Sequence, residues 1–240
     1  MGDSPAPAGA LQNLGREIGR GRIAKILKEA GVEPAPDRQR GTPWKEFLTS
    51  HWEVLAAAGF FTVEVWTARG LIRYHVLFVI RLATREVQIA GIIAEPHERW
   101  MKQVARNLTD GLDGFLSGCR PLIHDRAPRF GEGFRKVIEA AGIGSVRLPP
   151  RSPNLNAIAE RFVRSIKESC LDRMILIGES SLHRATAQFV LHDQHERNHH
   201  GLGNEIVKPE FAGFTPEGAI RCRDRLGGLL RYYSCCRCRR

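Results

Sequence analysis

The sequence predicts an α/β protein in which a mixed sheet carries helices on both faces. Three strand-like runs follow one another directly, at 60–66, 71–84 and 86–94. After them, short apolar strands alternate with amphipathic helices. This order, βββ-α-β-α-β-α-α, is typical of a mixed sheet covered on both sides.

The first half of this pattern has clear local signals. FFTVEVW at 60–66 alternates between apolar and polar residues, and LIRYHVLFVIRLAT at 71–84 is almost continuously apolar. A short turn centred on Arg85 leads into EVQIAGIIA, so the three runs form an antiparallel meander. Before them, EFLTSHWEVLAAAG has helical spacing at Phe47, Trp52 and Leu55, which predicts a helix up to the first strand.

The second half alternates helices and short strands. An amphipathic helix is predicted over about 97–112, a second over FGEGFRKVIEAAG, which Gly142 closes, and a last one over about 181–197. PLIHD and SVRLP are short buried strands. The helix of SPNLNAIAERFVRSIKESC follows, with Ser152 placed as its N-cap and Pro153 at its first position.

The charge balance indicates the kind of partner. The 240 residues include 36 Lys and Arg against 26 Asp and Glu, a formal charge of +10. Such an excess favours a polyanion, nucleic acid before an anionic membrane, although a basic surface without a specific partner is the alternative. No run is long enough for a membrane span, and MGDSPAPAGALQ has no signal-peptide apolar segment, so a cytoplasmic protein is expected. Three of the six cysteines lie in the last six residues, which does not suit a secreted disulfide framework.

Two carboxylates stand where a phosphodiester-processing site would need them. Asp125 follows a short apolar strand, where a turn-forming Asp is the simpler interpretation. Glu160 lies on a helix whose second face also carries Arg164 and Lys167. A Glu160–Arg164 ion pair would explain part of this face. Alternatively, the acids bind a hard divalent cation such as Mg²⁺ and the bases hold DNA phosphates.

Four segments together resemble the catalytic core of retroviral-type integrases and bacterial insertion-sequence transposases, the ribonuclease H-like DDE enzymes. They are WTARGLIRYHVLFVIRLATREV, LIHDRAPRF, VRLPPRSPNLNAIAERFVRSIKESCLDR and ERNHHGLGN. The resemblance covers about 45–230, and its SPN…AER…K block is the most specific part. It implies a mixed five-stranded sheet in the order β-β-β-α-β-α-β-α, and two Mg²⁺ or Mn²⁺ ions held by Asp, Asp and Glu. It also implies cleavage and joining of DNA strands.

By this resemblance, Asp125 and Glu160 are the catalytic, metal-ligating acids. Lys167 matches a basic residue that contacts DNA two helical turns after the Glu, and Arg164, Asn154 and Asn156 are expected to contact DNA as well. The first Asp of the family has no match, because Gly59 stands in its place in AAAGFFTVEVW. Gly59 weakens the expectation for the second ion in particular. Neither nearby acid is expected to replace the missing Asp. Glu64 lies an odd number of positions after Gly59, so it points to the opposite face of the strand, and Glu53 lies before the strand.

The expected function is transposase- or integrase-type DNA recombination, by metal-dependent phosphodiester cleavage and strand transfer, impaired by the loss of the first Asp. The alternative is a catalytically inactive DNA-binding remnant of a transposase. DNA, as transposon ends and target, and a homo-oligomer assembled on it are the expected partners. The expected domains are a disordered N-terminus with the remnant of a helix-turn-helix region (1–44), an integrase catalytic core (45–212) and a C-terminal extension with a basic, Cys-rich tail (213–240).

Three further sequence signals are weaker. His192, His195 and His199 share helical spacing typical of a metal face, but the loop ERNHHGL is better explained as lying near DNA. Trp66 and Trp100 are interpreted as core aromatics. The tail SCCRCRR lacks a paired CxxC and is expected to be frayed.

Overall fold

The computed structural model describes residues 44–148, 157–209 and 219–236. Contacts divide the chain into the units 1–47 and 48–240. The first unit contributes to this description only the start of helix α3 (Trp44–His51), and the elements that follow belong to the second. Residues 1–43, where the remnant of a helix-turn-helix region was expected, lie outside the described residues, as do Ser152, Pro153, Asn154 and Asn156.

The second unit is built on a five-stranded mixed sheet in the order β3-β2-β1-β4-β5. Strands β1 (Ala56–Thr67), β2 (Gly70–Arg81) and β3 (Val87–Ile93) form the predicted antiparallel meander. Strands β4 (Pro121–His124) and β5 (Gly144–Arg147) extend it in parallel from β1. The predicted fold class, a mixed five-stranded sheet with β-β-β-α-β-α-β-α order, is confirmed.

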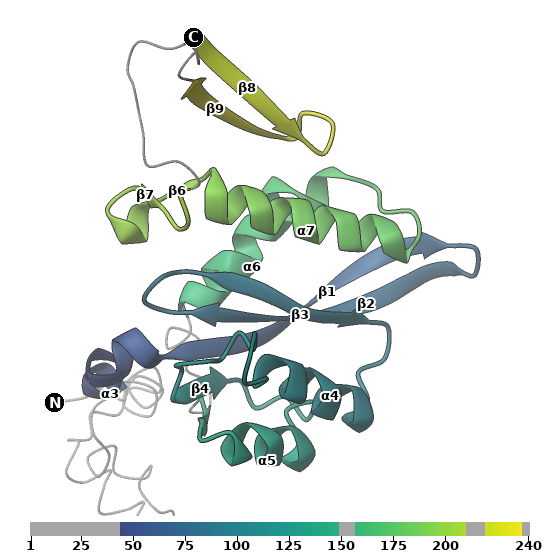
Figure 1. Cartoon of the computed structure of the whole chain (residues 1–240). Helices are drawn as coiled ribbons and strands as arrows, with labels where there is room; N and C mark the ends of the chain where they lie inside the picture. Colours follow the sequence, from purple (N-terminus) through teal and green to yellow (C-terminus); the bar gives the residue numbers. More distant parts are fainter. Residues whose placement is uncertain (1–43, 149–156, 210–218, 237–240) are drawn as a thin grey trace, which may run out of the picture. The chain divides into compact units, whose positions relative to one another are not determined.

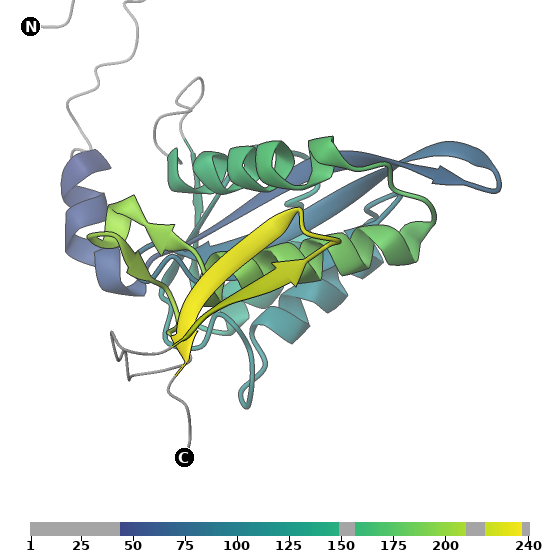
Figure 2. The ribbon, with the colours of Figure 1, turned by 90° about the horizontal axis from the view of Figure 1, so that it is seen from above.

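Helices cover both faces of this sheet (Figure 1). Helices α4 (Glu98–Leu108) and α5 (Glu132–Ala140) lie on one face. Helices α6 (Ala157–Ser169) and α7 (Glu179–His195) lie on the other, and Figure 2 shows them from above. The short helices η1 (Trp52–Val54), η3 (Leu171–Arg173) and η4 (His200–Leu202) and the ribbon β6 (Asn198–His199) with β7 (Glu205–Ile206) complete this part. None of the helices in the described residues is long and apolar enough to cross a membrane.

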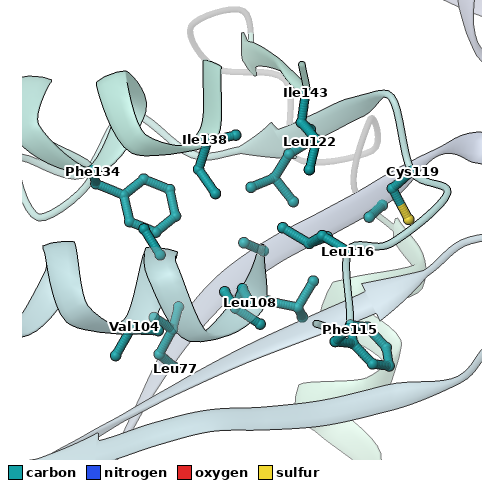
Figure 3. Close-up of a cluster of buried hydrophobic side chains, with 14 of the residues drawn as sticks. Leu77, Val104, Leu108, Phe115, Leu116, Cys119, Leu122, Phe134, Ile138 and Ile143 are labelled. Carbon is teal, nitrogen blue, oxygen red and sulfur yellow. The ribbon is translucent and has the colours of Figure 1, made fainter. Parts of the chain in front are cut away.

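The main core lies between the sheet and α4 and α5 (Figure 3). The apolar stripe of α4 places Val104 and Leu108 against Leu77 of β2, while Phe134 and Ile138 close the cluster from α5. Trp100 packs at its edge, as predicted for a core aromatic. Trp66 was predicted wrongly, because its side chain is 55% exposed near the end of the β1–β2 hairpin. That hairpin extends beyond β4, which pairs with β1 only at Ala56–Ala58.

Two sequence-based expectations are corrected by the fold. Residues 56–59 were included in the helix that the spacing of Phe47, Trp52 and Leu55 predicts, but they open β1. Ala56, Ala57 and Ala58 are fully buried between two neighbouring strands, and these tertiary contacts outweigh local propensity. The tail SCCRCRR was expected to fray, but its first three residues belong to β9 (Leu230–Cys236), and its last four lie outside the described residues. Strand β9 pairs with β8 (Ala219–Arg225) in a hairpin around a Gly227-Gly228 turn with positive φ.

Candidate metal centre and nucleic-acid interface

Gly59 and Asp125 are neighbours across the parallel pair of β1 and β4. The last residues in register are Ala58 and His124, and Gly59 and Asp125 come next on their respective chains. Adjacent strands lie about 4.8 Å apart, so the backbones of these two positions lie side by side. The position that lacks the family's first Asp is thus next to the predicted second Asp.

Both positions face α6 and α7. Ala58 belongs to the core under α4 and α5, and the His124 ring lies 4.7 Å from the ring of Phe130 in that same core. Because side chains alternate along a strand, Gly59 turns to the opposite face. Asp125 is the first residue after β4, and we expect it to continue the same alternation. A Cβ placed on Gly59 would lie 3.0 Å from Cε1 and Cζ of Phe78. The Phe78 ring in turn packs against Phe162 of α6 at 5.0 Å.

Hydrogen bonds fix the loop that carries Asp125. Its Oδ1 accepts from the backbone N–H of Ala127 at 3.0 Å, which is the turn expected of an Asp here. The fully buried ring of His124 lies 2.7 Å from the Asp125 carbonyl through Nδ1 and 2.9 Å from the Ser145 hydroxyl through Nε2. A carbonyl only accepts, so Nδ1 carries a proton. Burial lowers the pKa of His124, so the ring is neutral at pH 7 and Nε2 accepts from Ser145.

Glu160 lies in the first turn of α6 and is exposed. The helix buries Ala159, Phe162 and Ile166, and it contacts β1. Glu160 therefore enters from the side of the sheet on which Gly59 and Asp125 face. The alternative of a Glu160–Arg164 ion pair is not supported, because no such pair forms in the described part of the chain.

Lys167 lies two turns after Glu160, beside the outer part of β1. It lines a recess of about 360 Å³ together with Thr62, Glu64 and Arg73. Arg164 is exposed on the same helical face. Glu64 cannot replace the missing Asp, because it is on the opposite face from Gly59 and pairs with Arg73 at 3.0 Å. Glu53 lies in η1, before β1 begins.

The two-ion site that the resemblance implies needs three carboxylates, from two Asp residues and one Glu. Carboxylates are the ligands that Mg²⁺ and Mn²⁺ prefer, and two are available in Asp125 and Glu160. Gly59 contributes no oxygen, and no group of three or more His, Cys, Asp or Glu that could hold a metal occurs in residues 44–148, 157–209 and 219–236. The residues described therefore do not fit a three-carboxylate cage for two ions.

The histidines after Leu191 have hydrogen-bond partners within the protein. His192 Nδ1 lies 2.9 Å from Glu196 Oε2, and His199 Nε2 lies 2.7 Å from the carbonyl of Asp193. His195 Nδ1 lies 3.0 Å from the carbonyl of Lys208. The DNA-facing role of this loop stays a prediction.

Sequence reasoning missed the buried ionic network around Glu196. This carboxylate is 1% exposed and accepts from Arg225 through Nε at 3.0 Å and Nη2 at 2.7 Å. Arg223 lies 3.3 Å away. Burial by itself would raise the pKa of Glu196, but hydrogen bonds from Arg225 and His192 and their charges outweigh it and lower the pKa to about 2. The network joins α7 to the β8–β9 hairpin. In the sequence, the only signal for it is the presence of opposite charges ~30 positions apart.

Comparisons with known proteins locate the family signal in one part of the chain. Residues 141–205 match the family model described as integrase core domain. This segment includes Glu160, Arg164 and Lys167, while Gly59 and Asp125 lie outside it. No curated protein matches the chain. A solved structure that is similar is the catalytic core domain of BIV integrase, with 15% sequence identity, 65% of this chain and 91% of that chain covered, and a TM-score of 0.45. Over residues 141–205, the chain is therefore similar to the integrase core domain family.

Proposed function

We propose that this protein acts on DNA as an integrase- or transposase-type recombination protein whose phosphodiester chemistry is impaired at Gly59. The observation that carries the proposal is the parallel register of β1 and β4. It brings the Gly59 position beside Asp125, on the face of the sheet that α6 covers with Glu160. The match of residues 141–205 to an integrase core domain supports the same conclusion.

The remaining residues support DNA binding more strongly than catalysis. Arg164 and Lys167 present positive charge one and two turns after Glu160, where a strand leaving the candidate centre would carry its phosphates. Asp125 and Glu160 would bind a single divalent ion, which supplies charge neutralisation at a phosphate when bound. Assembly as a homo-oligomer on transposon ends belongs to the same proposal.

The catalytically inactive DNA-binding protein is the second candidate, and one observation favours it. Gly59 lacks a ligand, and the buried ring of Phe78 (1% exposed) takes up the space into which a side chain there would extend. The site thus lacks the third acid, and a side chain at position 59 would require the Phe78 ring to shift.

DNA binding without efficient strand transfer is the expected result for the purified chain. Binding of a short duplex should weaken steeply with salt, because Lys and Arg displace counterions from phosphates. Lys167→Gln should reduce the slope of log K against log salt by about 0.9, the value of one phosphate contact. Lys136→Gln is the matched control, since Lys136 is an exposed residue of α5 on the other face of the sheet.

The catalytic part is measured on the same preparations with labelled duplexes in Mg²⁺ or Mn²⁺. Weak Mn²⁺-dependent strand transfer that Glu160→Gln abolishes would identify an impaired enzyme. Complete absence of strand transfer would identify the catalytically inactive DNA-binding protein. Robust strand transfer by the unaltered chain would contradict the impairment. Absence of DNA binding at low salt would contradict the whole proposal.

A further inference from the structure

A second candidate site lies on the other side of α6. A cavity of about 480 Å³ opens between α6, the β2–β3 turn and the segment after α7, and we call it the α6–α7 pocket. Arg161 lines it, one position after Glu160 and hence rotated by about 100° around the helix. The remaining polar side chains that line it and matter here are Arg85, Ser165, Asp193, Arg197 and His199.

Positive charge in this pocket is only partly balanced. Of the described residues that line it, only Asp193 carries a carboxylate, and this carboxylate lies 3.4 Å from Arg197 Nη1 and 3.8 Å from His199 Nε2. Arg197 also donates to the Ser165 hydroxyl at 3.1 Å. Arg161 makes no ion pair or hydrogen bond in the described part of the chain. Among the described residues, the two guanidiniums of Arg85 and Arg161 therefore have no counterion in this cavity.

The Arg85 guanidinium has a buried hydrogen-bond donor, Nη1, without an acceptor among the described residues. Burial and the nearby charge of Arg161 lower the pKa of Arg85. Buried donors in folded proteins are almost always paired, so an unpaired one beside a second cation is informative. An anion with several acceptor oxygens would supply both the counterion for the two arginines and the hydrogen-bond acceptor for Arg85 Nη1.

The Arg85 side chain is also held in place in advance. Its backbone φ of 64° lies in the left-handed region that the tight turn between β2 and β3 uses. The guanidinium stacks over the Trp52 ring at 5.4 Å. On another side it approaches Gly201, where a Cβ would lie 3.5 Å from Nη2. A rigid fork of donors is the arrangement that binds phosphate oxygens well.

We propose that the α6–α7 pocket binds a phosphate group between Arg85 and Arg161. Tetrahedral phosphate oxygens can accept from both guanidiniums at once and use the free Nη1 donor of Arg85. The volume is larger than a free phosphate needs, so the group belongs to a larger molecule. The source is either a nucleic-acid backbone or a small phosphate ester. The site uses neither Asp125 nor Glu160, so it is independent of the candidate metal centre.

Calorimetric titration of the full chain with inorganic phosphate at low chloride tests the site. Saturable binding is expected, and Arg85→Asn and Arg161→Gln should each weaken it by about tenfold or more. Asn suits positive φ, so Arg85→Asn should keep the fold, which a thermal melt checks. Arg106→Gln removes the same charge from an exposed position of α4, on the other face of the sheet, and should leave phosphate affinity unchanged.

Equal phosphate affinity in the unaltered chain and both pocket variants would overturn the proposal. Absence of saturable phosphate binding by the folded chain would overturn it as well. A duplex oligonucleotide added during the titration identifies the source. Displacement of phosphate assigns the site to a nucleic-acid backbone, and undisturbed binding assigns it to a small phosphate ester. Strand-transfer assays play no part here, so failure of the metal-centre proposal leaves this result unaffected.

Discussion

Gly59→Asp combined with Phe78→Leu is expected to strengthen divalent-metal binding at the candidate centre. The Asp side chain would supply a third carboxylate beside Asp125, on the face of the sheet turned toward Glu160. Phe78→Leu removes the ring atoms Cε1 and Cζ, which lie 3.0 Å from a Cβ at position 59. We expect Mn²⁺ affinity to rise by at least about a hundredfold, or about 2.7 kcal/mol, in calorimetric titrations.

Two further variants separate the effect of the added carboxylate from the effect of the steric change. Gly59→Asp alone should destabilise the fold by about 1–3 kcal/mol, because the Phe78 ring must shift against Phe162. Gly59→Ala with Phe78→Leu has the same steric change without the carboxylate, and it should bind no more Mn²⁺ than the unaltered chain. Equal Mn²⁺ affinity in the Ala and Asp double variants would show that the three positions do not converge on a metal.

Glu196→Gln is expected to lower the free energy of unfolding by about 3–5 kcal/mol at pH 7. The change removes the carboxylate that pairs with Arg223 and with Arg225, whose side chain is only 14% exposed. Urea unfolding monitored by circular dichroism measures the loss. Glu205→Gln is the control, because Glu205 is an exposed carboxylate and its replacement should change the midpoint little.

The same network predicts a pH dependence with a definite sign. The pKa of Glu196 in the folded protein is about 2, below the usual value of 4.5 for a Glu carboxyl. The contribution of this carboxylate is therefore complete above pH 4.5 and is lost as the pH falls toward 2. The stability difference between the unaltered chain and Glu196→Gln should shrink by about 3 kcal/mol over that range. A difference that stays constant from pH 6 to pH 2.5 would contradict this assignment.

Most of the fold follows from local patterns in the sequence. The alternation in 60–66 and the apolar run at 71–84 predict β1 and β2, and the Arg85 turn between β2 and β3 has the positive φ typical of a tight turn. Residues 56–58 were included in the preceding helix, and only the neighbouring strands that bury these three Ala residues place them in β1. The β8–β9 hairpin was missed for a related reason, since its docking through Arg225 depends on Glu196, far away along the chain.

The sequence by itself determined the order of the elements, the two candidate acids and the absence of an acid at position 59, because each is a matter of residue type and local spacing. Only the tertiary structure decided that Gly59 lies beside Asp125, that the Phe78 ring occupies the space of the missing side chain, and that Arg85 and Arg161 share a cavity. These facts depend on strand register and on packing between distant segments. A register shift of one residue would reverse every side chain of β4 and separate Asp125 from the face of α6.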